Sequence, residues 1–146
     1  MGQLNTEISS QNKHKLQEAL EKEVDELMNE IIDYIFSEAR ENIVRNDTIG
    51  VTNNLFRKVT LDKTRKLEKT LTFEAPYADF IEYGTDPHYV NYKYLIEWAK
   101  KKAGLNDQDA KRMAYFVSKK IKENGMKAKP FLRPAMAKAK KKYGSL

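Results

Sequence analysis

The sequence predicts an α+β fold, in which a small antiparallel sheet is flanked by a long amino-terminal helix and shorter helices, two of which form a helical hairpin. Three observations lead to this fold class. An apolar stripe with helical spacing runs along residues 10–45, two strand-like segments follow within 55–75, and glycines punctuate short helical patterns beyond residue 76. A chain of 146 residues fits one domain, so we expect residues 1–146 to form a single unit.

The long helix is predicted by apolar residues that recur every three or four positions. They are Leu16, Leu20, Val24, Leu27, Ile31, Ile35, Ala39 and Ile43. This spacing places them on one face, and Asn46 followed by Gly50 ends the pattern. At about 1.5 Å per residue the helix is about 50 Å long, which is long for so small a domain. We therefore expect part of the stripe, including Leu20, to face another helix or subunit; a core helix with a solvated amino-terminal end is the alternative.

Two strands are predicted at 55–61 and 67–75, joined by the polar turn DKTRK. The first, LFRKVTL, is rich in β-branched and large apolar residues. The second, KLEKTLTFEA, alternates between two faces. One face carries Leu67, Lys69, Leu71, Phe73 and Ala75. The pair is typical of an antiparallel hairpin with one solvated face.

A short helix is predicted between Pro76 and Gly84. Proline suits a first helical turn, where its missing N–H would have no partner. Tyr77, Phe80 and Ile81 are spaced three and four apart and are predicted to form an aromatic inner face. A glycine at the end can adopt the positive φ that closes a helix, and the following Thr-Asp-Pro prevents its continuation.

Three further helices are expected towards the carboxyl terminus. The first, at 92–103, ends at Gly104, and its inward residues are predicted to be Leu95, Ile96, Trp98, Ala99 and Ala103. The second begins at the cap Asn106 and ends at Gly125. Residues 126–134 are expected to be largely extended, because a residue before proline avoids the helical region. The last helix is predicted to begin at Pro134.

The charge is divided unequally along the chain. Residues 1–92 carry 11 lysines and arginines against 17 aspartates and glutamates, whereas residues 93–142 carry 16 against 4. Such asymmetry suggests contact with nucleic acid or with a partner of opposite charge, including another copy of the chain. Solvated lysine faces are the alternative for any single patch.

Nothing in the sequence favours catalysis, a cofactor or a metal site. The chain has no cysteine, which excludes disulfides and thiolate metal ligands, and its two histidines, His14 and His88, are far apart. Asp79, Glu82, Asp86 and His88 are the residues that could in principle converge on a metal ion. Asp79 and Glu82, however, are expected on the outer face of the short helix as solvated carboxylates. No hydrolase, phosphate-binding or dinucleotide-binding motif occurs, so we expect no enzyme.

A DNA-binding interpretation rests on the basic second half. Residues 93–124 form two predicted basic helices with the outline of a helix-turn-helix. The second helix starts Asn106-Asp107-Gln108-Asp109, and two aspartates there would repel the DNA backbone. Non-specific contact with DNA through 93–142 remains the stronger form of this hypothesis. No signal peptide or membrane span is expected, because apolar clusters such as IIDYIF are short.

Four segments carry a resemblance to a known family: the long helix, TNNLFRKV (52–59), APYADFIEYGT (75–85) and KPFLRPAM (129–136). In this order they resemble the tail-completion, or head–tail joining (neck), proteins of long-tailed double-stranded-DNA phages and prophages. The two later motifs match closely, whereas NNLFR (53–57) departs from the family pattern in having Asn for Gly and an extra Phe before Arg. The matching structural residues are Pro76, Tyr77, Phe80, Ile81, Glu82, Tyr83, Gly84, Thr85, Pro130, Phe131, Leu132 and Pro134.

The resemblance implies a small α+β structural protein, without catalytic residues, that forms a ring at the head-proximal end of the tail. Its partners would be other copies of itself and the neighbouring head–tail connector and tail-tube proteins. It would reside in the host cytoplasm before assembly and in the virion afterwards. Relative to many family members, which join the two later motifs by a short hairpin, residues 91–126 are a helical insertion.

Two expectations combine the resemblance with the residues themselves. Residues 126–134 should return beside 75–85 as an extended strand. The basic half, including Lys100, Lys101 and Lys102, should meet the acidic helix of the next copy. A small basic nucleic-acid-binding module using 93–142 is the alternative function, and a small hydrolase or metal enzyme is a third.

Overall fold

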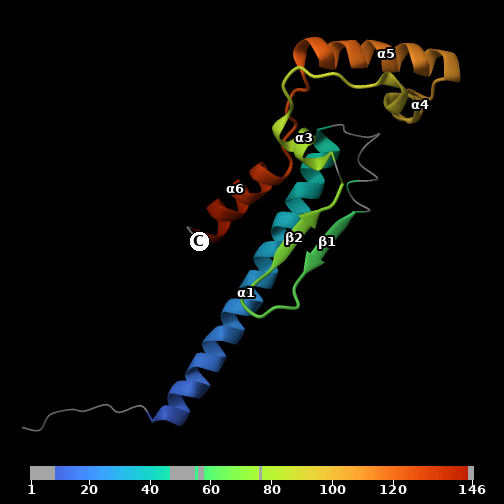
Figure 1. The fold of residues 1–146 in the computed structure, drawn as a ribbon. Helices are drawn as coiled ribbons and strands as arrows, with labels where there is room; N and C mark the ends of the chain where they lie inside the picture. The colour runs from blue at the N-terminus through green and yellow to red at the C-terminus, as the bar shows by residue number, and fades with distance from the viewer. Residues whose placement is uncertain (1–8, 47–54, 56–57, 76, 145–146) are drawn as a thin grey trace, which may run out of the picture.

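A long helix organises the fold in the computed structural model, which describes residues 9–46, 55, 58–75 and 77–144. Helix α1 spans Ser10–Arg45, as the apolar periodicity predicts. The Ser9 hydroxyl caps its start by accepting a hydrogen bond from the Asn12 N–H at 3.2 Å. The other helices and the strands gather along its carboxyl-terminal half, the β1–β2 loop reaches Glu21 and Asp25, and the first turns of α1 extend beyond them (Figure 1).

Within the described residues, β1 (Val59–Asp62) and β2 (Thr70–Phe73) form a two-stranded antiparallel sheet, which confirms the α+β fold class. Val59 pairs with Phe73, and Asp62 pairs with Thr70. Both strands are shorter than predicted. Leu55, expected in the first strand, is instead a fully buried core residue. In β2 the alternation is confirmed, since Thr70 and Thr72 are exposed and Leu71 and Phe73 turn inward.

The core lies where the end of α1 meets α3 (Ala78–Tyr83) and α6 (Leu132–Tyr143). Its buried members are Ala39, Ile43, Leu55, Ala75, Ala78, Ile81, Phe131 and Ala135. The rings of Phe73 and Phe131 meet edge to face, with centroids 4.9 Å apart. The aromatic face predicted for α3 is wrong for Phe80, which is half exposed, because Ala78, Ile81 and Glu82 occupy the inner side of this helix.

Helix α6 packs along α1 and begins earlier than predicted. Arg133, although it precedes Pro134, is helical, so residues 126–134 are not extended throughout. A proline within the first turn removes an N–H that has no helical partner, and therefore costs this helix little. Near the other end of α6, Lys138 pairs with Glu38 at 2.6 Å and the Tyr143 hydroxyl donates to Glu30 at 3.0 Å.

The remaining elements form the predicted helical hairpin. It consists of a short 3-10 turn η1 (Tyr92–Leu95), α4 (Ile96–Ala103) and α5 (Asp107–Asn124). Gly104 closes α4 in the left-handed conformation, and Asn106 caps α5 by accepting from the Asp109 N–H at 2.9 Å. The inward position predicted for Ala103 is wrong, because this last residue of α4 is exposed. The hairpin stands at the end of the molecule opposite the start of α1 (Figure 1).

Two glycines allow the hairpin and the core to meet closely. Thr85 and Met126 form an isolated antiparallel bridge, with N–H to carbonyl distances of 2.9 and 3.0 Å. Gly84 has a φ of +71°, as the prediction of a helix stop requires, and Gly125 has the same φ across the bridge. The strand expected along 126–134 is thus reduced to this bridge and one further bond, from Lys129 N–H to the Ile81 carbonyl at 2.8 Å.

Candidate assembly surfaces

Glu82 joins the two sequence motifs that carry the family resemblance. It lies on α3, yet the residue is only 4% exposed, so its predicted place on a solvated outer face is wrong. Its carboxylate accepts hydrogen bonds from the backbone N–H groups of Phe131, Leu132 and Arg133 at 2.7, 2.9 and 2.8 Å. These N–H groups open α6, where a helix has unpaired donors, so Glu82 caps a helix from another element.

Arg133 completes this junction. Its Nε donates to the Glu82 carboxylate at 3.0 Å, and its Nη2 donates to the Glu82 backbone carbonyl at 2.8 Å. The guanidinium also lies 4.6 Å from the centre of the Tyr83 ring. Burial raises the pKa of the Glu82 carboxyl, but the three backbone N–H groups and Arg133 outweigh burial and hold this pKa below its usual value.

The other residues weighed as metal ligands do not join Glu82. Asp79 and Asp86 are exposed, and the His88 ring contacts the Asp86 carbonyl at 2.8 Å and the Thr85 hydroxyl at 3.2 Å. Among the described residues, no group of three or more histidine, aspartate or glutamate side chains could hold a metal ion. The polar groups at this corner of the molecule instead join α3, α6 and the start of the hairpin to one another.

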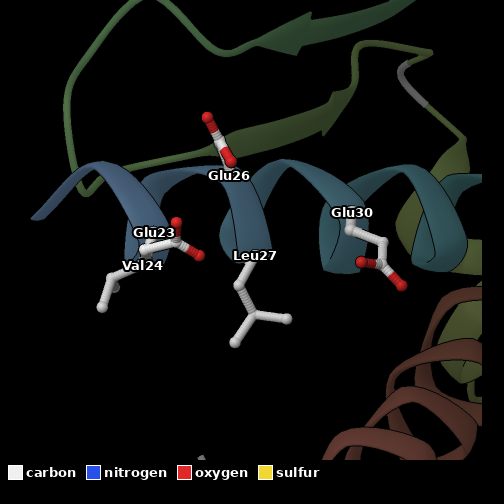
Figure 2. A pocket seen from close by; sticks show the side chains of 5 residues that line it. All are labelled: Glu23, Val24, Glu26, Leu27 and Glu30. Atoms are coloured by element: carbon white, nitrogen blue, oxygen red, sulfur yellow. The ribbon is translucent and has the colours of Figure 1, made fainter. Parts of the chain in front are cut away.

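The first half of the apolar face of α1 is not covered. Leu16, Leu20, Val24 and Leu27, which we call the α1 stripe, are each about half exposed, whereas Ile31, Ala39 and Ile43 further along are buried. Figure 2 shows Val24 and Leu27 pointing away from the side of α1 on which the β-strands lie. Glu23 and Glu30 lie beside them, so the stripe has an acidic border.

The loop between the two strands is held against this half of α1. Lys69 has a side chain only 3% exposed, and its Nζ lies 2.8 Å from Asp25 while donating to the Lys63 and Arg65 carbonyls. The Leu67 N–H also donates to Asp25, at 2.7 Å. Hydrogen bonds from Lys69 and from this N–H lower the pKa of the Asp25 carboxyl. The loop thereby places Leu67 next to the α1 stripe, where they line a shallow apolar groove together.

A second apolar surface lies between α3 and the helical hairpin. It is a cleft of about 530 Å³, which we call the aromatic cleft. Phe80 of α3 forms one wall, Tyr94 and Trp98 of the hairpin form another, and Met126 also lines it. Phe80 is 50% exposed and Tyr94 is 82% exposed, so large aromatic rings here face solvent. Lys101, Glu97 and His88 are the polar members of the lining.

The three consecutive lysines of α4 have separate roles. Lys100 pairs with Glu97 at 3.1 Å and with Asp107 at 2.7 Å, so it ties α4 to the start of α5. Lys101 lines the aromatic cleft. Lys102 is exposed, and its Nζ lies 5.3 Å from the centre of the Trp98 ring. Lys101 and Lys102 are therefore the pair available to a partner.

Sequence inspection missed three features of these surfaces: the buried Glu82, the buried Lys69 and the cleft itself. A short helix has too few residues to define its inner face from the sequence. The position of Glu82 among apolar residues was nevertheless a signal that it could be buried. Lys69 did share a predicted face with Leu67, Leu71 and Phe73. The cleft arises from the way α3 packs against the hairpin, and no pattern within one element could reveal it.

Comparison with known proteins yields no relative: no family model, curated protein or solved structure matches the chain. In the described part of the chain, no helix is both long and apolar enough to cross a membrane.

Proposed function

We propose that this chain is a structural protein of a phage or prophage virion. It serves there as a tail-completion, or head–tail joining, component that forms an oligomeric ring at the head-proximal end of the tail. The observation that carries the proposal is the Glu82 junction. The two motifs that resemble the family, 75–85 and 129–136, are bonded to each other through Glu82, Phe131 and Arg133. The resemblance implies that these two motifs lie side by side, and the junction supports that expectation.

Two further features support a role in assembly. The α1 stripe leaves four aliphatic side chains exposed on a helix whose other half is packed, which is the usual sign of a surface that binds another protein. The opposite charges of residues 1–92 and 93–142 favour head-to-tail contact between copies. Neighbouring connector and tail-tube proteins would bind the remaining faces of the ring.

A non-specific nucleic-acid contact is the second candidate, and one observation favours it. Tyr115 and Phe116 of α5 are exposed, and Lys111, Arg112, Lys119 and Lys120 around them are exposed as well. Aromatic rings among basic side chains are typical of proteins that stack on unpaired bases. The start of the same helix carries Asp107 and Asp109, which would repel phosphates.

Deleting the gene from the phage or prophage that encodes it tests the proposal. We expect DNA-filled heads and separate tails to accumulate, as counted by negative-stain electron microscopy, and a plasmid-borne wild-type copy to restore joined particles. A Glu82→Ala copy, in which the junction is broken, should restore few particles. Intact infectious virions from the deletion strain would rule out the joining role.

A further inference from the structure

The α1 stripe and the aromatic cleft, two apolar surfaces among the described residues, lie at opposite ends of the molecule. The α1 stripe lies on the amino-terminal half of α1, next to the β1–β2 loop, and the aromatic cleft lies beside α4 and α5 at the far end (Figure 1). One copy therefore cannot bring its own stripe to its own cleft. Contact between the two surfaces must involve two copies.

We propose that the α1 stripe of one copy docks into the aromatic cleft of the next. The inference deepens the proposed function and rests on it, because it names the contact by which copies would join. The helix supplies Leu16, Leu20, Val24 and Leu27, and the cleft supplies Phe80, Tyr94, Trp98 and Met126.

The stripe has the side-chain spacing of a helix that binds in a groove, and the cleft is an apolar hollow. The stripe presents side chains at intervals of three and four residues, which is the pattern with which an amphipathic helix anchors in a groove. From Leu16 to Leu27 it extends over about 17 Å at 1.5 Å per residue. The cleft is concave, and rings on two of its walls are at least half exposed, so docking would remove large apolar areas from water on both sides.

The charges favour this occupant over a second stripe. Residues 10–30 carry 6 acidic against 3 basic side chains, whereas residues 91–129 carry 11 basic against 4 acidic ones. Glu23 and Glu30 border the stripe, while Lys101 and Glu97 both line the cleft, so the positive charge around the cleft comes from the surrounding hairpin. Two stripes packed on each other would place acidic borders side by side, while stripe in cleft places opposite charges together.

This contact joins two different patches, so each added copy still offers a free stripe at one end and a free cleft at the other. Such a head-to-tail contact closes into a ring when its rotation allows, and otherwise continues as a filament. The docking mode therefore leads directly to the ring proposed above.

Disulfide trapping tests the contact, and the absence of native cysteine makes the background clean. Leu20→Cys and Tyr94→Cys proteins are mixed under mild oxidation at low salt, the second carrying a size tag, and are separated on a non-reducing gel. Docked cysteines experience a far higher effective concentration than free ones, so we expect mixed dimers in about tenfold excess over the control. The control mixes Lys22→Cys with Tyr89→Cys. Lys22 is on α1 and Tyr89 precedes η1, and both are exposed but line neither surface.

Two results would overturn the inference. One is a Leu20→Cys homodimer that forms more readily than the mixed dimer, which would mean that stripes pack on stripes. The other is a mixed-dimer yield equal to that of the control. Either result leaves the deletion experiment untouched, so a chain that joins heads to tails through another surface would fail here and still pass there.

Discussion

At the scale of single residues, Glu82 is the charged side chain that links the two motifs. Its carboxylate is buried and bonds to N–H groups 49 to 51 residues further along the chain. A hydrogen bond to a charged group contributes about 1.5–3 kcal/mol, and a buried donor left unpaired costs about 1–3 kcal/mol. The residue is thus a cap, an ion-pair partner and a long-range link at once.

We expect Glu82→Gln to lower the free energy of unfolding by about 2–4 kcal/mol, since an amide presents one acceptor oxygen and no charge. Asp79→Asn, on the exposed face of the same helix, is the control and should change stability by less than about 0.5 kcal/mol. Urea denaturation of both variants measures this. Equal stabilities would show that the carboxylate does not hold α6.

The pH dependence follows from the same residue. Because its pKa in the folded protein lies below the unfolded value of about 4.3, Glu82 adds stability above that value, and this stability disappears as pH falls through the folded pKa. The gap in stability between wild type and Glu82→Gln should therefore be widest near neutral pH and narrow on acidification. A gap independent of pH would contradict the lowered pKa.

Gly84 is the second residue whose replacement should be costly. A Cβ atom there would lie 2.5 Å from the Met126 carbonyl oxygen and 2.8 Å from the Ala128 nitrogen, and the φ of +71° is itself unfavourable for a side chain. Gly104 is a matched control, with a φ of +60° but open space around it. We expect Gly84→Val to lower the melting temperature several times more than Gly104→Val. Similar losses would mean that backbone strain alone matters.

At the scale of elements, α1 is divided into a packed half and an uncovered half. Ile43 is 1% exposed within the core, whereas Leu20 is 57% exposed on the α1 stripe. The same apolar periodicity thus serves two purposes along one helix. The uncovered half is the surface that we propose binds a partner, because covering its aliphatic row would remove apolar area from water.

Leu20→Asp should leave the cooperative thermal transition of the monomer unchanged and weaken self-association by about tenfold or more, since docking would bury an unpaired carboxylate. Ile43→Asp is the opposite control and should abolish folding. Sedimentation velocity and thermal denaturation of both variants check this. A Leu20→Asp protein that keeps its association but melts early would place Leu20 within the fold of its own subunit.

Elements with long, regular patterns were predicted well, and short ones less well. The bounds of α1 follow from its apolar periodicity, and the start of α5 follows from the cap Asn106. The inner face of α3 did not follow from the sequence, because in a helix of six residues tertiary contacts decide which side is buried. Glu82 is buried there, and Phe80 is not. The early start of α6 was equally hidden, since its cap comes from another element rather than from its own sequence.

At the scale of the whole molecule, the acidic and basic parts of the sequence lie on different elements of the fold. Helix α1 carries 9 acidic against 5 basic residues, whereas the helical hairpin and α6 together carry 14 basic against 4 acidic ones. Sequence counts predicted an opposite-charge partner, but only the structure separates lysines that serve the fold, such as Lys100, from those that face outward, such as Lys101 and Lys102.

We expect Lys101→Glu/Lys102→Glu to weaken self-association at low salt more than Lys140→Glu/Lys141→Glu, an identical change of charge on exposed positions of α6. The difference should shrink as salt shortens the screening length to about 8 Å at physiological strength. Lys100 is left intact so that the hairpin stays closed. Equal effects of the two double variants would mean that net charge, not the aromatic cleft, controls association.

The most direct test of the ring itself is the native mass of the wild-type chain across a range of protein concentration at low salt, with negative-stain images of the largest species. We predict that association ends at one discrete oligomer whose images are closed rings. A chain that stays monomeric at every concentration, yet retards DNA on a gel, would contradict assembly through copies and favour the nucleic-acid function instead.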